Sequence, residues 1–290
     1  MWAGGRAFLR AIVGEKRQNL SCPDKRPELD SGAPQGMVIS MSTHEEILST
    51  NNNKTGKTND KTNDKTNDKK AREFISPSDL TFSWNDCHRC LWLYYNHGVK
   101  NPSFMPLVGD LADMQERYFD GASSHHMDPG IPKGKVLDRG KFVVSKPIEV
   151  NGQPSKFAIR GKYDILMEFE DGSFGVIDCK FQARDTDKSD FYAPQLEAYA
   201  FALENPAQGE PRRVSSLGLF VWSLVTPRGN ADSGFGLQLK SSWRPIERNP
   251  EALQSRLTEF ITMISSPVKN AQNCAHCRYI SERREILGTE

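Results

Sequence analysis

Apolar and polar residues alternate near the middle of the chain in the manner of a β-hairpin. Two mostly apolar runs, residues 159–169 and 173–181, flank the polar segment Glu170-Asp171-Gly172. A three-residue loop with glycine in the left-handed position commonly joins two antiparallel strands. The sequence therefore predicts two paired strands joined by this loop. A two-residue Asp171-Gly172 turn is the alternative, and it would shift the register by one residue.

The three-residue loop determines which residues of the two strands face each other. It pairs Phe169 with Ser173 and, counting outward, Asp164 with Asp178. Directly opposed residues share a face of the sheet, and so do strand residues two apart. We therefore expect Asp164, Asp178, Lys180 and Lys162 to point the same way. The opposite face should carry a nearly unbroken apolar set: Ile159, Tyr163, Ile165, Met167, Phe169, Ile177, Cys179 and Phe181.

The rest of the region from residue 74 to residue 280 alternates between helical and strand patterns. A helix start is predicted at residues 76–80, with Ser76 as N-cap and Pro77 in the first turn. Helices are predicted over residues 87–95, 110–119, 190–204 and 250–264, and further strands over residues 142–150, 214–226 and 234–243. The proline at position 147 favours an edge position for the first of these strands. Strands interleaved with helices predict an α/β fold with a central mixed β-sheet flanked by helices.

The N-terminal part of the chain has a different composition. Between residues 57 and 68 the sequence Lys-Thr-Asn-Asp occurs three times in succession. Such a segment has no apolar face to bury, so it cannot offset the entropy lost on ordering. We expect residues 1–70 to be a disordered low-complexity tail and residues 71–290 to form the folded domain.

Charge and hydropathy exclude little, but they narrow the possible partners. The 290 residues include 38 basic and 37 acidic ones, for a net charge of +1. Bulk charge therefore gives no argument for a nucleic-acid partner, and any basic groove must be local. No apolar run approaches the roughly 20 residues of a membrane span. Residues 1–13 are only weakly typical of a targeting segment, because Arg10 interrupts their apolar part and no cleavage site follows. We expect a cytoplasmic protein with no membrane contact.

Two carboxylates and a lysine on one face of a hairpin suit a hard divalent cation. Magnesium prefers oxygen ligands, often one or two carboxylates completed by waters and substrate phosphate. The main-chain carbonyl of Cys179 could supply a further oxygen to Asp164 and Asp178. Lys180 could orient or deprotonate a water, or neutralise charge that develops on a phosphate. The same residues would also suit a surface acid and an ordinary ion pair on a strand.

The spacing of these residues resembles that of a known nuclease family. Asp164, the Asp178-Cys179-Lys180 segment, and Gln195 followed by Tyr199 resemble the PD-(D/E)XK nuclease superfamily, specifically its RecB-type branch. The resemblance implies a restriction-endonuclease-like core and a Mg²⁺- or Mn²⁺-dependent DNA nuclease. It further implies an exonuclease acting on DNA ends or single strands in DNA repair, recombination or defence, with a possible helicase partner. In such enzymes, residues at the positions of Gln195 and Tyr199 flank the active site. They contact the substrate strand or support the lysine.

A helix upstream of the hairpin resembles a further motif of this family. In that motif a metal-binding histidine follows a glycine by four residues, and here the corresponding residues are Gly109 and Asp113. Asp113 could still bind magnesium, and Glu116, one turn further, is a second candidate. The departure from histidine favours the alternative function: a catalytically inactive DNA-binding or adaptor module with a nuclease-like fold.

Four cysteines lie in two pairs at the ends of the predicted domain. Cys87 and Cys90 form one CxxC pair, and Cys274 and Cys277 form the other. Two such pairs are typical of a four-thiolate site for zinc or for an iron–sulfur cluster, although free buried cysteines are the alternative. His88 and His276 could also serve as ligands. The nuclease resemblance, in particular to exonucleases of the CRISPR-associated and AddB type, implies a 4Fe-4S cluster that joins the chain ends. Those exonucleases carry one cysteine upstream and three downstream, so Zn²⁺ remains the alternative here.

Overall fold

The computed structural model describes residues 38–40, 71–100, 107–268, 270 and 274–288. The chain divides into two units, residues 1–35 and 36–290, and all described residues belong to the second. The expected tail, residues 1–70, lies outside the described residues apart from strand β1 (Val38–Ser40), which pairs with β9.

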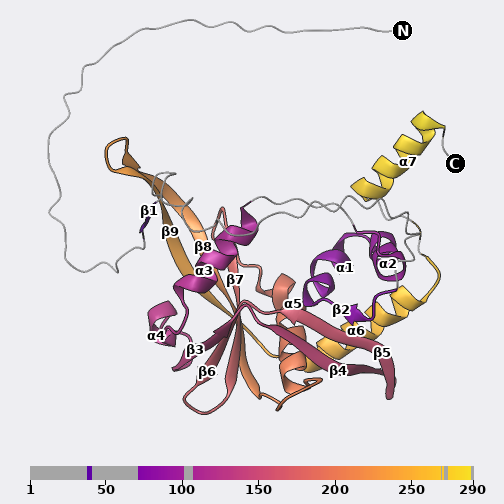
Figure 1. The fold of residues 1–290 in the computed structure, drawn as a ribbon, viewed down its shortest axis with the longest axis horizontal. Helices are drawn as coiled ribbons and strands as arrows, with labels where there is room; N and C mark the ends of the chain where they lie inside the picture. The colour runs from indigo at the N-terminus through magenta and orange to yellow at the C-terminus, as the bar shows by residue number, and fades with distance from the viewer. Residues whose placement is uncertain (1–37, 41–70, 101–106, 269, 271–273, 289–290) are drawn as a thin grey trace, which may run out of the picture. The chain divides into compact units, whose positions relative to one another are not determined.

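The larger of two sheets contains six strands in the order β1-β9-β8-β7-β6-β3 (Figure 1). Strands β7 and β8 run parallel, and every other neighbouring pair is antiparallel, so the sheet is mixed as predicted. The further strands of this sheet are β3 (Gly134–Arg139), β6 (Ile165–Phe169), β7 (Phe174–Gln182), β8 (Val214–Asn230) and β9 (Gly234–Ile246).

A second sheet contains three strands in the order β2-β5-β4, where the sequence predicts a single central sheet. Its strands are β2 (Phe74–Ile75), β5 (Gln153–Lys162) and β4 (Phe142–Val150). Strand β4 lies at an edge, which confirms the expectation drawn from its proline. The chain leaves this sheet after Lys162 and enters the larger one at Ile165.

That change of sheet corrects one part of the predicted hairpin. Ile159 and Tyr163 were expected on the same face as Ile165 and Met167, but they are buried in a different hydrophobic cluster. The alternation of faces holds only along a continuous strand. Residues 163 and 164 belong to no strand, so the alternation of side chains along β5 does not continue into β6.

The predicted helices are confirmed with small changes at their ends. They are α2 (His88–His97), α3 (Val108–Tyr118), α5 (Ser189–Glu204) and α6 (Pro250–Ser265). The helix start predicted at residues 76–80 is the 3₁₀-helix η1 (Pro77–Leu80), with Ser76 as its N-cap. The sequence patterns did not reveal β3, α1 (Phe82–Asp86), α4 (Ser124–Met127) or α7 (Ala275–Leu287). Among the described residues, no helix has the length and apolar character needed to cross a membrane.

Two hydrophobic cores bury both faces of the larger sheet. One core joins residues of α5 and α6, among them Leu196 and Phe260, to Leu166 and Val176 of the hairpin. The other lies on the opposite face and contains Ile177 together with apolar residues near α4 and β3. In Figure 1, α5 and α6 cover one side of the strands and α3 and α4 lie on the other. The hairpin therefore runs through the centre of the domain, and polar residues at its end are held within packed surroundings.

Candidate active site

The hairpin has the register that the three-residue loop predicts. Ile165 pairs with Ile177 and Glu168 with Phe174. The Phe169 amide donates to the Ser173 carbonyl at 2.9 Å, and Gly172 has the left-handed φ of 74°. This register is confirmed, and it sets Asp164 opposite Asp178 at the end of the paired strands.

Asp164 lies where the chain passes between the two sheets. Its Oδ2 accepts a hydrogen bond from the main-chain amide of Cys179 at 2.7 Å, so the two strands are joined beside the site. Burial raises the pKa of Asp164 well above its ordinary value, and the neighbouring charge of Asp178 raises it further. This carboxyl group therefore favours a nearby cation or a bound proton.

Asp178 is the most enclosed acid of the site, with 2% of its surface exposed. Its Oδ1 accepts a hydrogen bond from Gln195 Nε2 at 2.8 Å, and its Oδ2 forms an ion pair with Lys180. Lys180 also lies over the ring of Tyr192, 4.8 Å from its centroid. Buried carboxylates are stable only with such partners.

Lys180 is protonated in this arrangement. Burial alone would lower its pKa, but the charges of Asp178 and Asp164 outweigh that effect and raise the pKa above the ordinary value. A lysine in this state neutralises negative charge or donates a proton. A cation bound to the two carboxylates would weaken their effect on this pKa, so both roles expected for Lys180 stay predictions.

Helix α5 carries Gln195 and Tyr199 on the face that meets the site. Gln195 contacts Asp178 directly, whereas the hydroxyl of Tyr199 donates to the main-chain carbonyl of Lys162 at 2.7 Å. Gly161 permits this close approach, because a Cβ there would lie 2.8 Å from the Tyr199 ring and 2.6 Å from Pro77. Tyr199 thus holds the end of β5, and with it the position of Asp164.

The third acid near the pair is Glu116 of α3. Asp113, on the same helix, is half-buried and pairs with Arg117, and its charge contributes to raising the pKa of Glu116. Glu116 is buried, and its charge is close enough to raise the pKa of Asp164. Its own pKa is raised by burial, an effect that the charge of Lys162, with Nζ 3.8 Å from Oε2, partly offsets. The structure therefore buries Glu116 close to the carboxylate pair, whereas Asp113 lies half-buried one turn earlier on the same helix.

Tyr192 and Lys162 also contribute to the site. The sequence motifs did not indicate Tyr192, whereas the hairpin register predicted Lys162 on the face of the two acids. Tyr192 precedes Gln195 by three residues, so the two share a face of α5. Lys162 precedes Asp164 by two residues and reaches Glu116 from the end of β5. The spacing on α5 could have indicated Tyr192. The contact of Lys162 depends on how α3 docks, which no local pattern shows.

The four cysteines come together as predicted. The sulfur atoms of Cys87, Cys90, Cys274 and Cys277 lie within 4.8 Å of one another. Cys87 and Cys274 are the N-cap residues of α2 and α7, and each partner lies three residues further, in the first turn. Burial raises the pKa of Cys90, so a bound cation is needed to keep its thiolate form. The histidines at positions 88 and 276 are not part of this group of ligand atoms.

An α/β domain with two opposed carboxyl groups at the end of a central hairpin is the arrangement that the sequence resemblance implies. A model of the PD-(D/E)XK nuclease superfamily matches residues 105–281, more than half of the chain, and the chain belongs to this superfamily. The match begins after Cys87 and Cys90 and includes the second cysteine pair.

Comparison with solved structures adds little to this assignment. Eighteen chains match. One of them, titled "Crystal structure of SSO0001", is 12% identical over 67% of this chain and 78% of that chain, with a TM-score of 0.39. No curated protein matches.

The hydroxyl of Tyr199 can be tested separately from its ring. We predict that Tyr199→Phe lowers the free energy of unfolding by about 1 to 2 kcal/mol, because the carbonyl of Lys162 loses its hydrogen bond. Tyr192→Phe is the matched control on the same helix. It keeps the ring over Lys180 and should change stability by less than about 0.5 kcal/mol. Urea unfolding followed by circular dichroism measures both, and equal effects would contradict the assigned role of Tyr199.

Proposed function

We propose that this protein is a metal-dependent deoxyribonuclease that hydrolyses phosphodiester bonds. The observation that carries the proposal is the group formed by Asp164, Asp178 and Glu116, with Lys180 beside it. Three acids within range of one another's charge are costly to bury unless a cation binds between them. Membership of the PD-(D/E)XK nuclease superfamily also supports the proposal of a nuclease.

The residues at this site suit Mg²⁺ or Mn²⁺. Oxygen donors dominate, and Oε2 of Glu116 is buried without a hydrogen-bond partner among the described residues. Asp164, Asp178 and Glu116 would hold the ion, and the main-chain carbonyl of Cys179 could add an oxygen. When bound, such an ion stabilises charge on the scissile phosphate and activates a water.

The chain's own side chains have distinct tasks in this proposal. Lys180, held protonated by Asp178, would stabilise the negative charge that develops on the phosphate during displacement. Gln195 would fix the orientation of Asp178 through its amide. Tyr199 would act through the main chain of Lys162, as a positioning residue rather than a catalytic one.

Action on DNA ends or single strands is the form of cleavage that we favour. This choice follows from the RecB-type resemblance. The same resemblance supports a role in repair, recombination or defence and a helicase partner. The competing proposal of an inactive DNA-binding or adaptor module depended on an aspartate at position 113. Because Glu116 supplies a buried acid at the site, that feature no longer argues against cleavage.

The cysteine group would hold a structural metal that joins α2 to the start of α7. Three sulfur–sulfur separations are 3.6, 3.8 and 3.9 Å. A tetrahedral zinc ion with bonds of about 2.3 Å has sulfur–sulfur edges of about 3.8 Å. A 4Fe-4S cluster puts each thiolate on a different iron and needs wider spacing. The spacing therefore supports zinc, whereas the family resemblance supports the cluster.

Cleavage should depend on the buried residues and not on Asp113. With Mg²⁺ or Mn²⁺ and labelled single- and double-stranded DNA, we predict that Asp178→Asn and Lys180→Met each lower the cleavage rate at least about a hundredfold. Asp113→Asn is the matched control, because it removes only an exposed pair worth little energy, and it should cleave within about twofold of wild type. If wild type cleaved DNA no faster than Asp178→Asn does, the proposal that the protein is a nuclease would be refuted.

Metal analysis and absorbance of anaerobically purified protein test the cysteine site. We predict one zinc per chain and no visible iron–sulfur band for wild type. Cys90→Ser should lose the metal and unfold at a lower temperature, because it removes a ligand between the two helices. Cys179→Ser, a buried cysteine outside the group, should keep it. A visible band with about four irons per chain would establish the cluster instead.

A further inference from the structure

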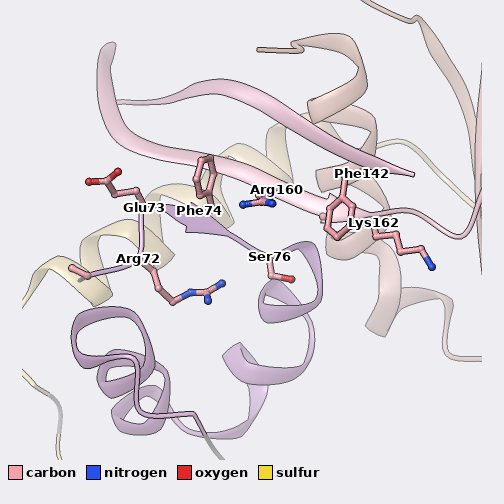
Figure 2. A pocket seen from close by; sticks show the side chains of 9 residues that line it. Arg72, Glu73, Phe74, Ser76, Phe142, Arg160 and Lys162 are labelled. Carbon is pink, nitrogen blue, oxygen red and sulfur yellow. The ribbon is translucent and has the colours of Figure 1, made fainter. Parts of the chain in front are cut away.

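One face of the three-stranded sheet is turned away from the core and carries aromatic and basic side chains. Phe74 of β2, Arg160 of β5 and Phe142 of β4 line a groove of about 510 Å³. Figure 2 shows the two rings on either side of the Arg160 guanidinium, with Arg72 extending toward them from below. Each strand of the sheet thus contributes one of the three central side chains.

The pairing of the strands explains why these residues gather on one face. Phe142 pairs directly with Lys162, and Phe74 pairs with Ala158, so both rings share a face with Arg160. The intervening residues point the other way and are buried, as Ile75 and Ile159 show. The alternation is therefore apolar inward and aromatic or basic outward.

The three central side chains of the groove contact one another and remain open to solvent on one side. Phe142 is 68% exposed, although it is a large apolar residue on an edge strand. The Arg160 guanidinium lies 5.5 Å from the ring centroid of Phe74 and 5.6 Å from that of Phe142. Within the described part of the chain, no carboxylate pairs with Arg160. Glu73 also lines the groove, at the end away from Lys162 (Figure 2).

The groove leads to the candidate active site along β5. Lys162 follows Arg160 on the same face, about 6.6 Å further along the strand, and Asp164 follows after two more residues. Lys162 Nζ lies 3.8 Å from Glu116 Oε2. A ligand that fills the groove therefore extends along β5 toward Lys162 and the carboxylate group.

We propose that this groove binds single-stranded nucleic acid next to the site of cleavage, an inference that rests on the proposed function. The rings of Phe74 and Phe142 would stack on bases, and Arg160 would contact a phosphate. Only a single strand offers free base faces, because stacking in a duplex covers them. With a net charge of +1 for the whole chain, attraction to phosphate must come from such a local group.

Fluorescence anisotropy with a labelled oligothymidine tests the groove in the full-length Asp178→Asn protein, which should bind without cleaving. Phe142→Ala should weaken binding about tenfold through the loss of one stacking ring, and Phe142→Trp should restore it. Arg160→Gln should lower the slope of log affinity against log salt by about 0.7, the value for one phosphate contact on a single strand.

Two exposed residues near the tip of the β8–β9 hairpin are matched controls. Phe235→Ala and Arg228→Gln remove a similar ring and a similar charge outside the groove, and both should bind like the parent. Unfolding temperatures check that each variant folds. Unchanged binding by Phe142→Ala, or equally tight binding of a blunt duplex with the same sensitivity to Phe142→Ala, would overturn the proposal.

The proposal of a binding groove and the proposal of nuclease activity can fail separately, and each failure gives a different result. If wild type cleaves DNA while Phe142→Ala binds and cleaves like wild type, the groove is refuted and the nuclease stands. If no preparation cleaves DNA but Phe142→Ala still loses oligothymidine binding, the enzyme is refuted and the groove stands.

Discussion

The site is organised by the repulsion between Asp164 and Asp178, two carboxyl groups that the hairpin register holds opposite each other. Every close contact of the pair reduces that repulsion. The Cys179 amide and the Gln195 side chain donate hydrogen bonds, and Lys180 supplies a positive charge. Glu116 adds a third acid, so three carboxyl groups share the site with two lysines, Lys180 and Lys162. A divalent cation reduces the repulsion among these acids, which is why an otherwise destabilising cluster suits catalysis.

Two helices complete the site in different ways. Helix α5 meets the hairpin through Gln195 and holds the end of β5 through Tyr199, so it fixes where the acids lie. Helix α3 is fixed by the hydrogen bond from Gln115 to the carbonyl of Phe220 at 2.9 Å, and it brings in Glu116. The close approach of α5 is possible only because residue 161 is glycine. Geometry at the site thus depends on main-chain contacts as much as on the acids.

The parts of this arrangement that follow from local chemistry could be predicted from the sequence. The loop with Gly172 determined the register, and a spacing of four residues placed Gln195 and Tyr199 on one helix face. Two CxxC pairs predicted the cysteine group. The sequence named Glu116 only as a second candidate after Asp113, because which of the two lies nearer the acids depends on how α3 is rotated against the sheet. The change of sheet at Tyr163 has no local signal either, so the phase of Ile159 was assigned incorrectly.

Calorimetric titration with Mn²⁺ tests the central claim, that the hairpin register creates a cation site, without requiring any substrate. Wild type and Asp113→Asn should bind the ion alike, because Asp113 lies outside the buried group. Asp164→Asn should bind at least about tenfold more weakly, since it removes a charged oxygen ligand. Equal affinity in wild type and Asp164→Asn, or a loss of affinity confined to Asp113→Asn, would contradict the account.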